Sequence, residues 1–204
     1  MFTEYELESM VDIPEILEAT QALKKDFIKS EAPYLEVSDH DFFSLVMMSP
    51  MVGVAMANGS ISFFEERSLN KKARKLSKGG YFMKKDPVVY AMQFLFKNFN
   101  NWDDKFYALL KTAIETSFHY EGIAKQKADS MEVSYSEYKM EVLKQPYILI
   151  RFIASFFLEN DEEIISNERT IGKAEHASMV EIGGKLGLDE IPVFQMFCKT
   201  FTIK

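Results

Sequence analysis

Residues 57–66 read Ala-Asn-Gly-Ser-Ile-Ser-Phe-Phe-Glu-Glu, and they combine the end of one helix with the start of the next. Asn58-Gly59 predicts a helix end, because glycine, and secondarily asparagine, adopts the left-handed conformation that closes a helix. Ser62 and Glu65 have the spacing of a capping box, in which each side chain bonds a free backbone N–H of the first helical turn. The stretch therefore predicts a tight turn between two helices.

A weaker copy of this pattern follows about a hundred residues later. A shift of 103 residues places the positions of Asn58, Ile61 and Glu65 on Asp161, Ile164 and Glu168. The apolar segment 51–57 then falls on 154–160, and a helix is predicted after both turns. Two copies of one helix–turn–helix unit would bury their apolar faces against each other, so we expect a pseudo-two-fold internal repeat.

The remainder of the chain is also predicted to be helical. Phe (18) and Met (12) are frequent, whereas Gly (9) and Pro (6) are sparse, which favours helices over a turn-rich β fold. Apolar residues recur at helical spacing, and no segment alternates as a strand would. We expect an all-α protein of about nine helices, with helix breaks at Pro50 and at Asn100-Asn101.

Length and cysteine usage indicate one helical domain with an extension. The 204 residues divide into an expected N-terminal helical extension, residues 1–38, and a main domain, residues 39–204. The single cysteine, Cys198, lies in an apolar run and is expected to be buried, and its solitary occurrence favours a reducing compartment. The apolar run 147–158 is too short to span a bilayer, which needs roughly 20 residues. We therefore expect a cytoplasmic protein without a transmembrane segment.

Charge is unevenly distributed along the chain, whose net charge is −7. Residues 65–85 carry eight bases against two acids, whereas residues 1–41 carry eleven acids against three bases. The simplest interpretation of the basic segment is a solvated helix face. The functional interpretations are a docking face for an acidic partner, of which the chain's own N-terminal arm is one candidate, or weak binding of anions. The residues assigned to it are Arg67, Lys71, Lys72, Arg74 and Lys75. Binding of nucleic acid is disfavoured by the net charge.

The two turns resemble the tellurite-resistance TerB family of all-helical proteins. The resemblance rests on residues 54–65, a small-residue helix followed by Asn-Gly-Ser-Ile and a glutamate, and on Gly-Lys-Leu-Gly-Leu-Asp-Glu at 184–190. It covers roughly residues 42–200. It implies a TerB-like helical bundle and a non-enzymatic binding or adaptor role in a bacterial stress response such as tellurite resistance. It also implies a protein partner at a membrane-associated complex.

The resemblance further implies binding of a divalent cation, such as Ca²⁺, Mg²⁺ or Zn²⁺, near the two turns. The candidate ligands are Asn58, Glu65, Asp161, Glu162 and Glu168. The family's Asp is replaced by Asn58 in the first copy, which removes a hard anionic ligand there. Glu65 has a second explanation as a capping-box residue, and the two roles are compatible. The alternative is a structural interaction domain without metal. No nucleophile, phosphate-loop or redox motif is present, so no enzymatic activity is expected.

Overall fold

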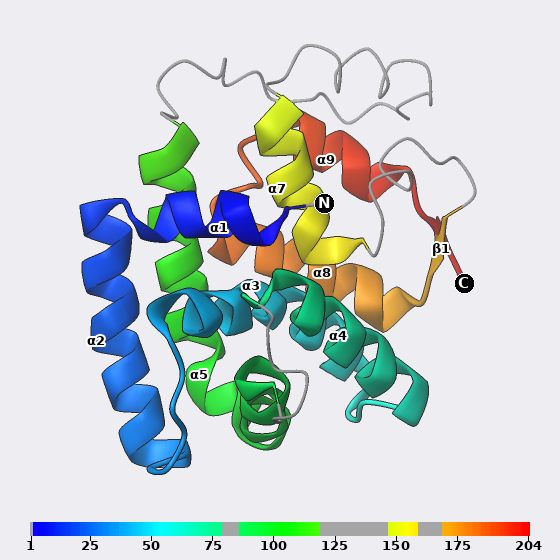
Figure 1. Ribbon diagram of the computed structural model, residues 1–204. Helices are drawn as coiled ribbons and strands as arrows, with labels where there is room; N and C mark the ends of the chain where they lie inside the picture. Colours follow the sequence, from blue (N-terminus) through cyan, green and yellow to red (C-terminus); the bar gives the residue numbers. More distant parts are fainter. Residues whose placement is uncertain (1, 79–85, 119–146, 159–168) are drawn as a thin grey trace.

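The computed structural model describes residues 2–78, 86–118, 147–158 and 169–204, and this part of the protein is mostly helical (Figure 1). The all-α prediction is confirmed at this level. The elements in chain order are α1 (Glu4–Val11), α2 (Pro14–Glu31), α3 (Asp39–Ala55), η1 (Met56–Asn58), α4 (Phe63–Leu76), α5 (Pro87–Phe118), α7 (Tyr147–Phe157), β1 (Thr170–Ile171), α8 (Lys173–Lys185), α9 (Pro192–Lys199) and β2 (Thr202–Ile203).

Helix α3 is the centre of the fold, and it packs against α1, α2, α4, α5, α7 and α8. Every residue from His40 to Pro50 is buried, because the helix is surrounded by apolar side chains on all sides. Within the described residues, the segment Asp39–Asn58 is long and apolar enough to span a membrane, and 72% of its most apolar window is buried inside the protein. Packing in this fold therefore accounts for its hydrophobicity.

Pro50 does not interrupt α3, contrary to the sequence prediction. Proline lacks the N–H that would bond the carbonyl of Val46 one turn earlier. The hydroxyl of Ser49 donates to that same carbonyl at 2.7 Å, so the oxygen keeps a partner and the helix continues.

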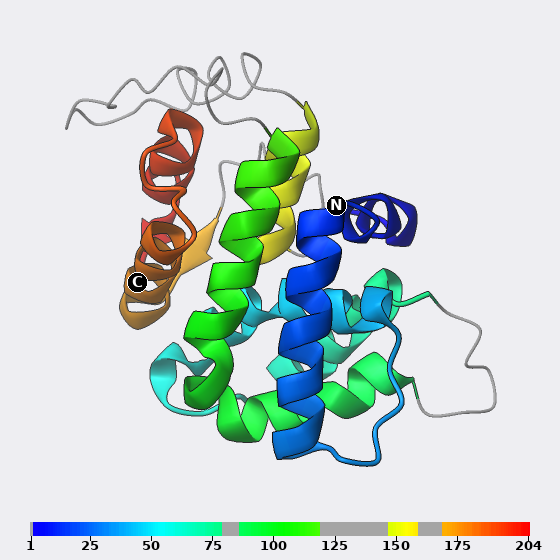
Figure 2. The ribbon, with the colours of Figure 1, turned by 90° about the vertical axis from the view of Figure 1, so that its left-hand side faces the viewer.

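The break predicted at Asn100-Asn101 lies two residues earlier, at Asn98, whose non-helical φ −125° and ψ 25° place a kink between the two helical parts of α5. The side chain of Asn98 donates to Glu31 at 2.5 Å, and the indole N–H of Trp102 donates to the other oxygen of the same carboxylate at 2.8 Å. Glu31 ends α2, so this carboxylate fixes the bend of α5 against α2. Figure 2 shows α5 between α2 on one side and α8 on the other.

The segment expected as an N-terminal extension contributes to the same core as the rest of the chain. Leu7, Ile16 and Phe27 are fully buried, and the rings of Phe2 and Phe152 meet edge to face with centroids 4.8 Å apart. Helices α1 and α2 therefore belong to the single hydrophobic core of the described residues.

Two very short strands were not expected from the sequence. β1 and β2 pair in parallel, with Thr170 opposite Thr202 and Ile171 opposite Ile203. Each strand has two residues, which is too short for the alternating pattern by which a strand is recognised.

The carboxylate of Glu6 links α1 to α7, and we expect this link to weaken in acid. Partial burial raises the pKa of Glu6, but bonds from the backbone of Thr3 and from Arg151 outweigh burial and hold the pKa below 4.5. A lowered pKa means that the contribution to stability is present above pH 4.5 and is lost as the pH falls through the folded-state pKa.

The Glu6→Gln variant should lose up to about 1 kcal/mol of unfolding free energy at neutral pH, and the difference from wild type should shrink on acidification. Urea denaturation at a series of pH values from neutral to acidic measures this difference in unfolding free energy. Glu18→Gln, at an exposed glutamate of α2, is the control. A Glu6→Gln deficit that is independent of pH would contradict the role given to the charge.

Candidate functional site

Helix α4 begins as the sequence predicts. Gly59 has φ 89°, the left-handed conformation that ends the preceding turn. The backbone N–H of Ser62 donates to the carboxylate of Glu65 at 2.7 Å, and the N–H of Glu65 donates to the hydroxyl of Ser62 at 3.3 Å. The capping box is therefore formed, and it places Phe63 and Phe64 at the first two helical positions.

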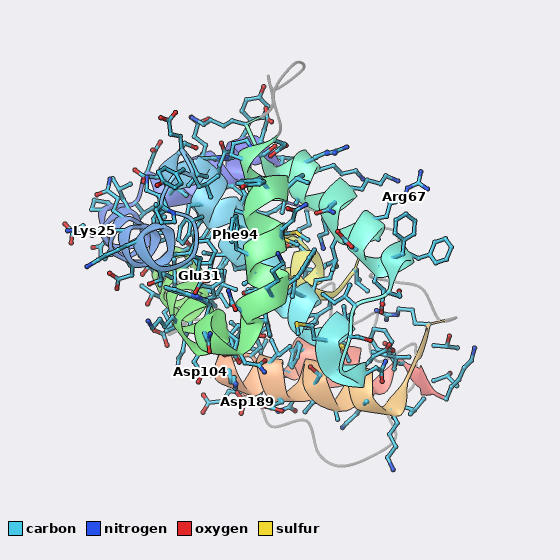
Figure 3. All side chains as sticks on the ribbon, turned by 90° about the horizontal axis from the view of Figure 1, so that it is seen from below. Lys25, Glu31, Arg67, Phe94, Asp104 and Asp189 are labelled. Atoms are coloured by element: carbon cyan, nitrogen blue, oxygen red, sulfur yellow. The ribbon has the colours of Figure 1, made fainter. Side chains whose placement is uncertain are left out.

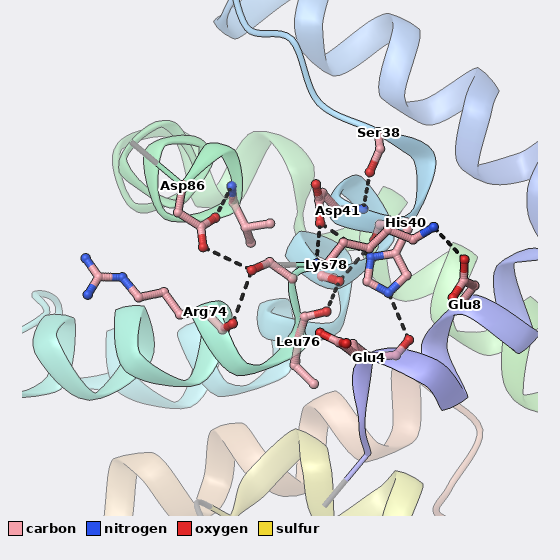
Figure 4. A network of polar contacts seen from close by, with 12 residues as sticks. Glu4, Glu8, Ser38, His40, Asp41, Arg74, Leu76, Lys78 and Asp86 are labelled. Carbon is pink, nitrogen blue, oxygen red and sulfur yellow. Dashed lines mark hydrogen bonds and ion pairs between the residues drawn. The ribbon is translucent and has the colours of Figure 1, made fainter. Parts of the chain in front are cut away.

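The other end of α4 is fixed by buried polar contacts with α3 and with the start of α5 (Figure 4). The hydroxyl of Ser44 donates to the carbonyl of Leu76 at 2.9 Å. The fully buried carboxylate of Asp41 accepts the backbone N–H of Lys78 at 3.0 Å. Ser77 donates to Asp86 at 3.0 Å. The first of these bonds satisfies a carbonyl that the helix end leaves free, and the other two fix the residues that follow it to α3 and to the start of α5, so α4 is held at both ends.

The acidic N-terminal arm reaches the basic segment at this same end. The ammonium of Lys78 lies 2.5 Å from Glu8 of α1. This bond lowers the pKa of Glu8 and raises the pKa of Lys78. Nearby, Nε2 of His40 lies 3.0 Å from the carbonyl oxygen of Glu4 (Figure 4). The arm therefore contacts the basic segment beyond the end of α4 and leaves the outer side of the helix exposed.

The outer side of α4 combines aromatic and basic side chains. At about 100° per residue, six exposed residues fall within an arc of about 120°. This surface, called the α4 face below, consists of Phe63, Phe64, Arg67, Lys71, Arg74 and Lys75. The two phenylalanines are 72% and 80% exposed, and their ring centroids are 5.9 Å apart.

Within the part of the chain that the structure describes, no ion pair opposes the positive charge of the α4 face. The two acids of the first turn, Glu65 and Glu66, lie outside its arc, and the carboxylate of Glu65 is used in the capping box. Among the described residues, none of the four basic side chains of the face forms an ion pair. Figure 3 shows Arg67 projecting from α4 away from the body of the molecule. The face can therefore attract an anionic surface and offer two apolar rings to it.

Lys72 is not part of this surface, and the prediction that placed it there is wrong. Its side chain is only 4% exposed. The ammonium donates to the carbonyl of Ser155 at 2.5 Å and to the carbonyl of Leu158 at 2.7 Å. The physical reason is the helical phase, since position 72 lies on the inner side of α4 with Leu69 and Leu76. Lys72 supplies donors to the end of α7.

The candidate metal ligands are only partly described. Asp161, Glu162 and Glu168 lie outside the described residues. The amide of Asn58 donates to Oε1 of Glu175 at 3.0 Å, while Oε2 of Glu175 accepts the backbone N–H of Gly172 at the start of α8. Among the described residues, no group of three or more His, Cys, Asp or Glu side chains is placed to hold a metal ion.

Cation binding at the second turn remains a prediction from the sequence. We expect calorimetry to show uptake of Ca²⁺, Mg²⁺ or Zn²⁺ by the wild-type chain, and we expect Asp161→Ala combined with Glu168→Ala to abolish it, since both remove carboxylate ligands. Asn58→Ala should have a smaller effect, because an amide is the weaker ligand. Uptake that is unchanged in the double variant would contradict the prediction.

Sequence reasoning missed the exposure of Phe63 and Phe64, and a signal for it was present. Leu69 and Leu76 define the inner side of α4, and helical periodicity places both phenylalanines well away from it.

The burial expected for Cys198 is confirmed, and this burial raises the pKa of its thiol to about 12.

Comparisons with known proteins give no relative. No model of a protein family matches the chain, and no match is found among curated proteins or solved structures. The class defined by the described residues is an all-helical bundle that presents the α4 face on its surface.

Proposed function

We propose that this chain is a non-enzymatic, TerB-like binding or adaptor protein that docks onto an anionic partner through the α4 face. The observation that supports this function is the face itself, which has two exposed phenylalanine rings and four bases within one arc of a helix. Exposed aromatic side chains beside arginine are typical of binding surfaces. The setting we propose, from the resemblance, is a stress response in the bacterial cytoplasm.

The TerB-like part of the proposal is supported by contacts between the two suggested repeats. Lys72 and Glu175 are 103 residues apart, which is the shift that aligns the two turns. Lys72 donates to carbonyls at the end of α7, and Glu175 accepts from Asn58 just after α3. Lys72, in the first copy, thus bonds the end of the first helix of the second copy. Glu175, in the second copy, bonds the end of the first helix of the first copy. Such an exchange is expected of two units related by a pseudo-two-fold axis.

The alternative, a structural interaction domain without metal, would use the same face. Docking by positive charge and exposed rings requires no cation, so loss of metal binding would leave it intact. The two versions differ in whether the chain takes up divalent cations, which the calorimetric experiment above decides separately.

Docking through the α4 face should depend on salt, because exposed charges are screened at high ionic strength. We expect the full chain to bind polyanionic probes, poly-L-glutamate or anionic lipid vesicles, with an affinity that falls as salt rises. Reversal to Glu at Arg67, Lys71, Arg74 and Lys75 should abolish this binding.

The matched control reverses four exposed lysines elsewhere, which gives the same change in net charge. These are Lys25, Lys29, Lys97 and Lys199. This variant should bind almost as wild type does. Equal loss in both variants, or binding that does not depend on salt, would contradict docking through the α4 face.

A further inference from the structure

We propose that the anionic partner of the α4 face is the surface of a lipid bilayer, into which Phe63 and Phe64 insert while the bases contact anionic headgroups. This inference rests on the docking function proposed above and names the class of partner. It depends on the two rings, on the placement of the bases, and on the charge of the rest of the chain.

Packing within the protein does not account for the position of the two rings, because both are largely exposed. Phe63 is 72% and Phe64 is 80% exposed, and they contact each other edge to face. Among the exposed large hydrophobic residues of the described chain they are the only phenylalanines, and the only two adjacent in sequence. Phenylalanine has no polar group with which to bond water, so a paired exposed site is a candidate for burial in another apolar phase.

The bases extend from the rings along the same face of α4. Arg67, Lys71, Arg74 and Lys75 are exposed and follow over the next turns of the helix. A helix that lies in the interface of a membrane has this composition, with Phe entering the acyl boundary and Lys or Arg at the level of anionic headgroups. Because the capping box fixes the start of α4 and buried bonds fix its end, the face is already formed before contact.

The composition favours a bilayer over an acidic protein. Interfaces between proteins are depleted in lysine, whereas phenylalanine and lysine on one helix are typical of a membrane interface. Two of the four bases of the α4 face are lysines, and both of its rings are phenylalanine. A purely acidic polypeptide such as poly-L-glutamate would pair with the charges but offers no apolar phase to the rings.

The remainder of the chain would orient the molecule on such a surface. The net charge of −7 includes four positive charges on the α4 face, so all other residues together carry −11. An anionic bilayer repels this part and attracts the face, and binding should occur with α4 towards the membrane.

Vesicle co-sedimentation of the full chain tests the proposal. We expect binding to vesicles of phosphatidylcholine with phosphatidylserine and little binding to phosphatidylcholine alone. Reversal of the four bases of the α4 face should lower the partition coefficient by about 1,000-fold or more. Phe63→Ser with Phe64→Ser should lower it about tenfold or more. The control reversal of Lys25, Lys29, Lys97 and Lys199 should lower it little, and circular dichroism checks that each variant is folded.

Insertion is measured with a Phe64→Trp variant. The native Trp102 is 4% exposed in the core, so its emission should not respond to lipid, whereas a tryptophan at position 64 should shift to the blue and be quenched by brominated acyl chains. Absence of both signals in bound protein would overturn insertion of the rings.

The remaining outcomes separate the inference from the function on which it rests. Equal binding to neutral and anionic vesicles, or unchanged binding after the double serine substitution, would overturn the inference. Binding of poly-L-glutamate through the α4 face without binding of vesicles would overturn the lipid assignment and leave docking to an acidic protein. Binding of neither probe would overturn both proposals.

Discussion

Substitution of Gly183 by alanine is expected to destabilise the protein by about 3 kcal/mol, because there is no room for a side chain at this position. A Cβ atom there would lie 2.2 Å from two ring carbons of Phe194, far inside van der Waals contact. The ring has little freedom to move away, since Phe194 is 2% exposed and packs against Phe157 and Phe197. Either α8 and α9 must separate or the ring must leave its rotamer.

The next residue provides a matched control. A Cβ at Gly184 meets no atom within 4 Å, and the residue lies in the same helix. Gly184→Ala should therefore stabilise the protein by about 0.5–1 kcal/mol, since alanine has the higher helix propensity. Urea denaturation of both variants measures the difference. Similar destabilisation by both substitutions would show that the helix backbone, and not the contact with Phe194, causes the loss of stability.

The second large effect is expected at Lys72. Lys72→Met should reduce the free energy of unfolding by about 2–4 kcal/mol, because methionine fills the space of the aliphatic stem but donates no hydrogen bond. The carbonyl oxygens of Ser155 and Leu158 would then each lose a charge-assisted bond at the end of α7.

Lys71 provides the comparison for this substitution. Lys71 is exposed on the α4 face, so Lys71→Met should change stability by no more than about 0.5 kcal/mol. Thermal and urea unfolding of the two single variants give the result directly. A neutral or stabilising effect of Lys72→Met would show that the free-energy cost of burying the ammonium is at least as large as the stabilisation from its hydrogen bonds.

Local chemistry was the part of the fold that the sequence predicted best. The positive φ of Gly59 and the capping box of Ser62 and Glu65 each depend on residues close together in the chain. Such features are determined by backbone preferences that do not require knowledge of the packing.

The failures have a common physical origin in contacts made outside the local pattern. Pro50 was expected to end a helix, but the neighbouring hydroxyl of Ser49 supplies the donor that proline lacks. The bend of α5 lies at Asn98 because Glu31, from a distant helix, bonds both Asn98 and Trp102. Neither the rotamer of a serine nor the approach of a remote carboxylate follows from composition or spacing.

The candidate site was predicted in part. Four of the five basic residues assigned to docking are exposed, but a lysine was counted as a surface charge even where helical phase placed it inside, at position 72. The exposure of Phe63 and Phe64 was not predicted, although helical periodicity places both residues away from Leu69 and Leu76. In both cases helical periodicity indicated the correct side of α4, but the prediction relied on residue type.

The central position of α3 has a consequence for the synthesis of the protein. Its surface is covered in part by α8, which begins at Lys173, more than a hundred residues after α3 ends at Ala55. At about 5–20 residues per second, the ribosome needs roughly 6–24 s to make the intervening chain. During that interval the strongly apolar helix α3 is not yet packed against α8. We therefore expect nascent chains of this protein to bind chaperones until α8 has emerged, and expression in cells depleted of them to yield aggregates.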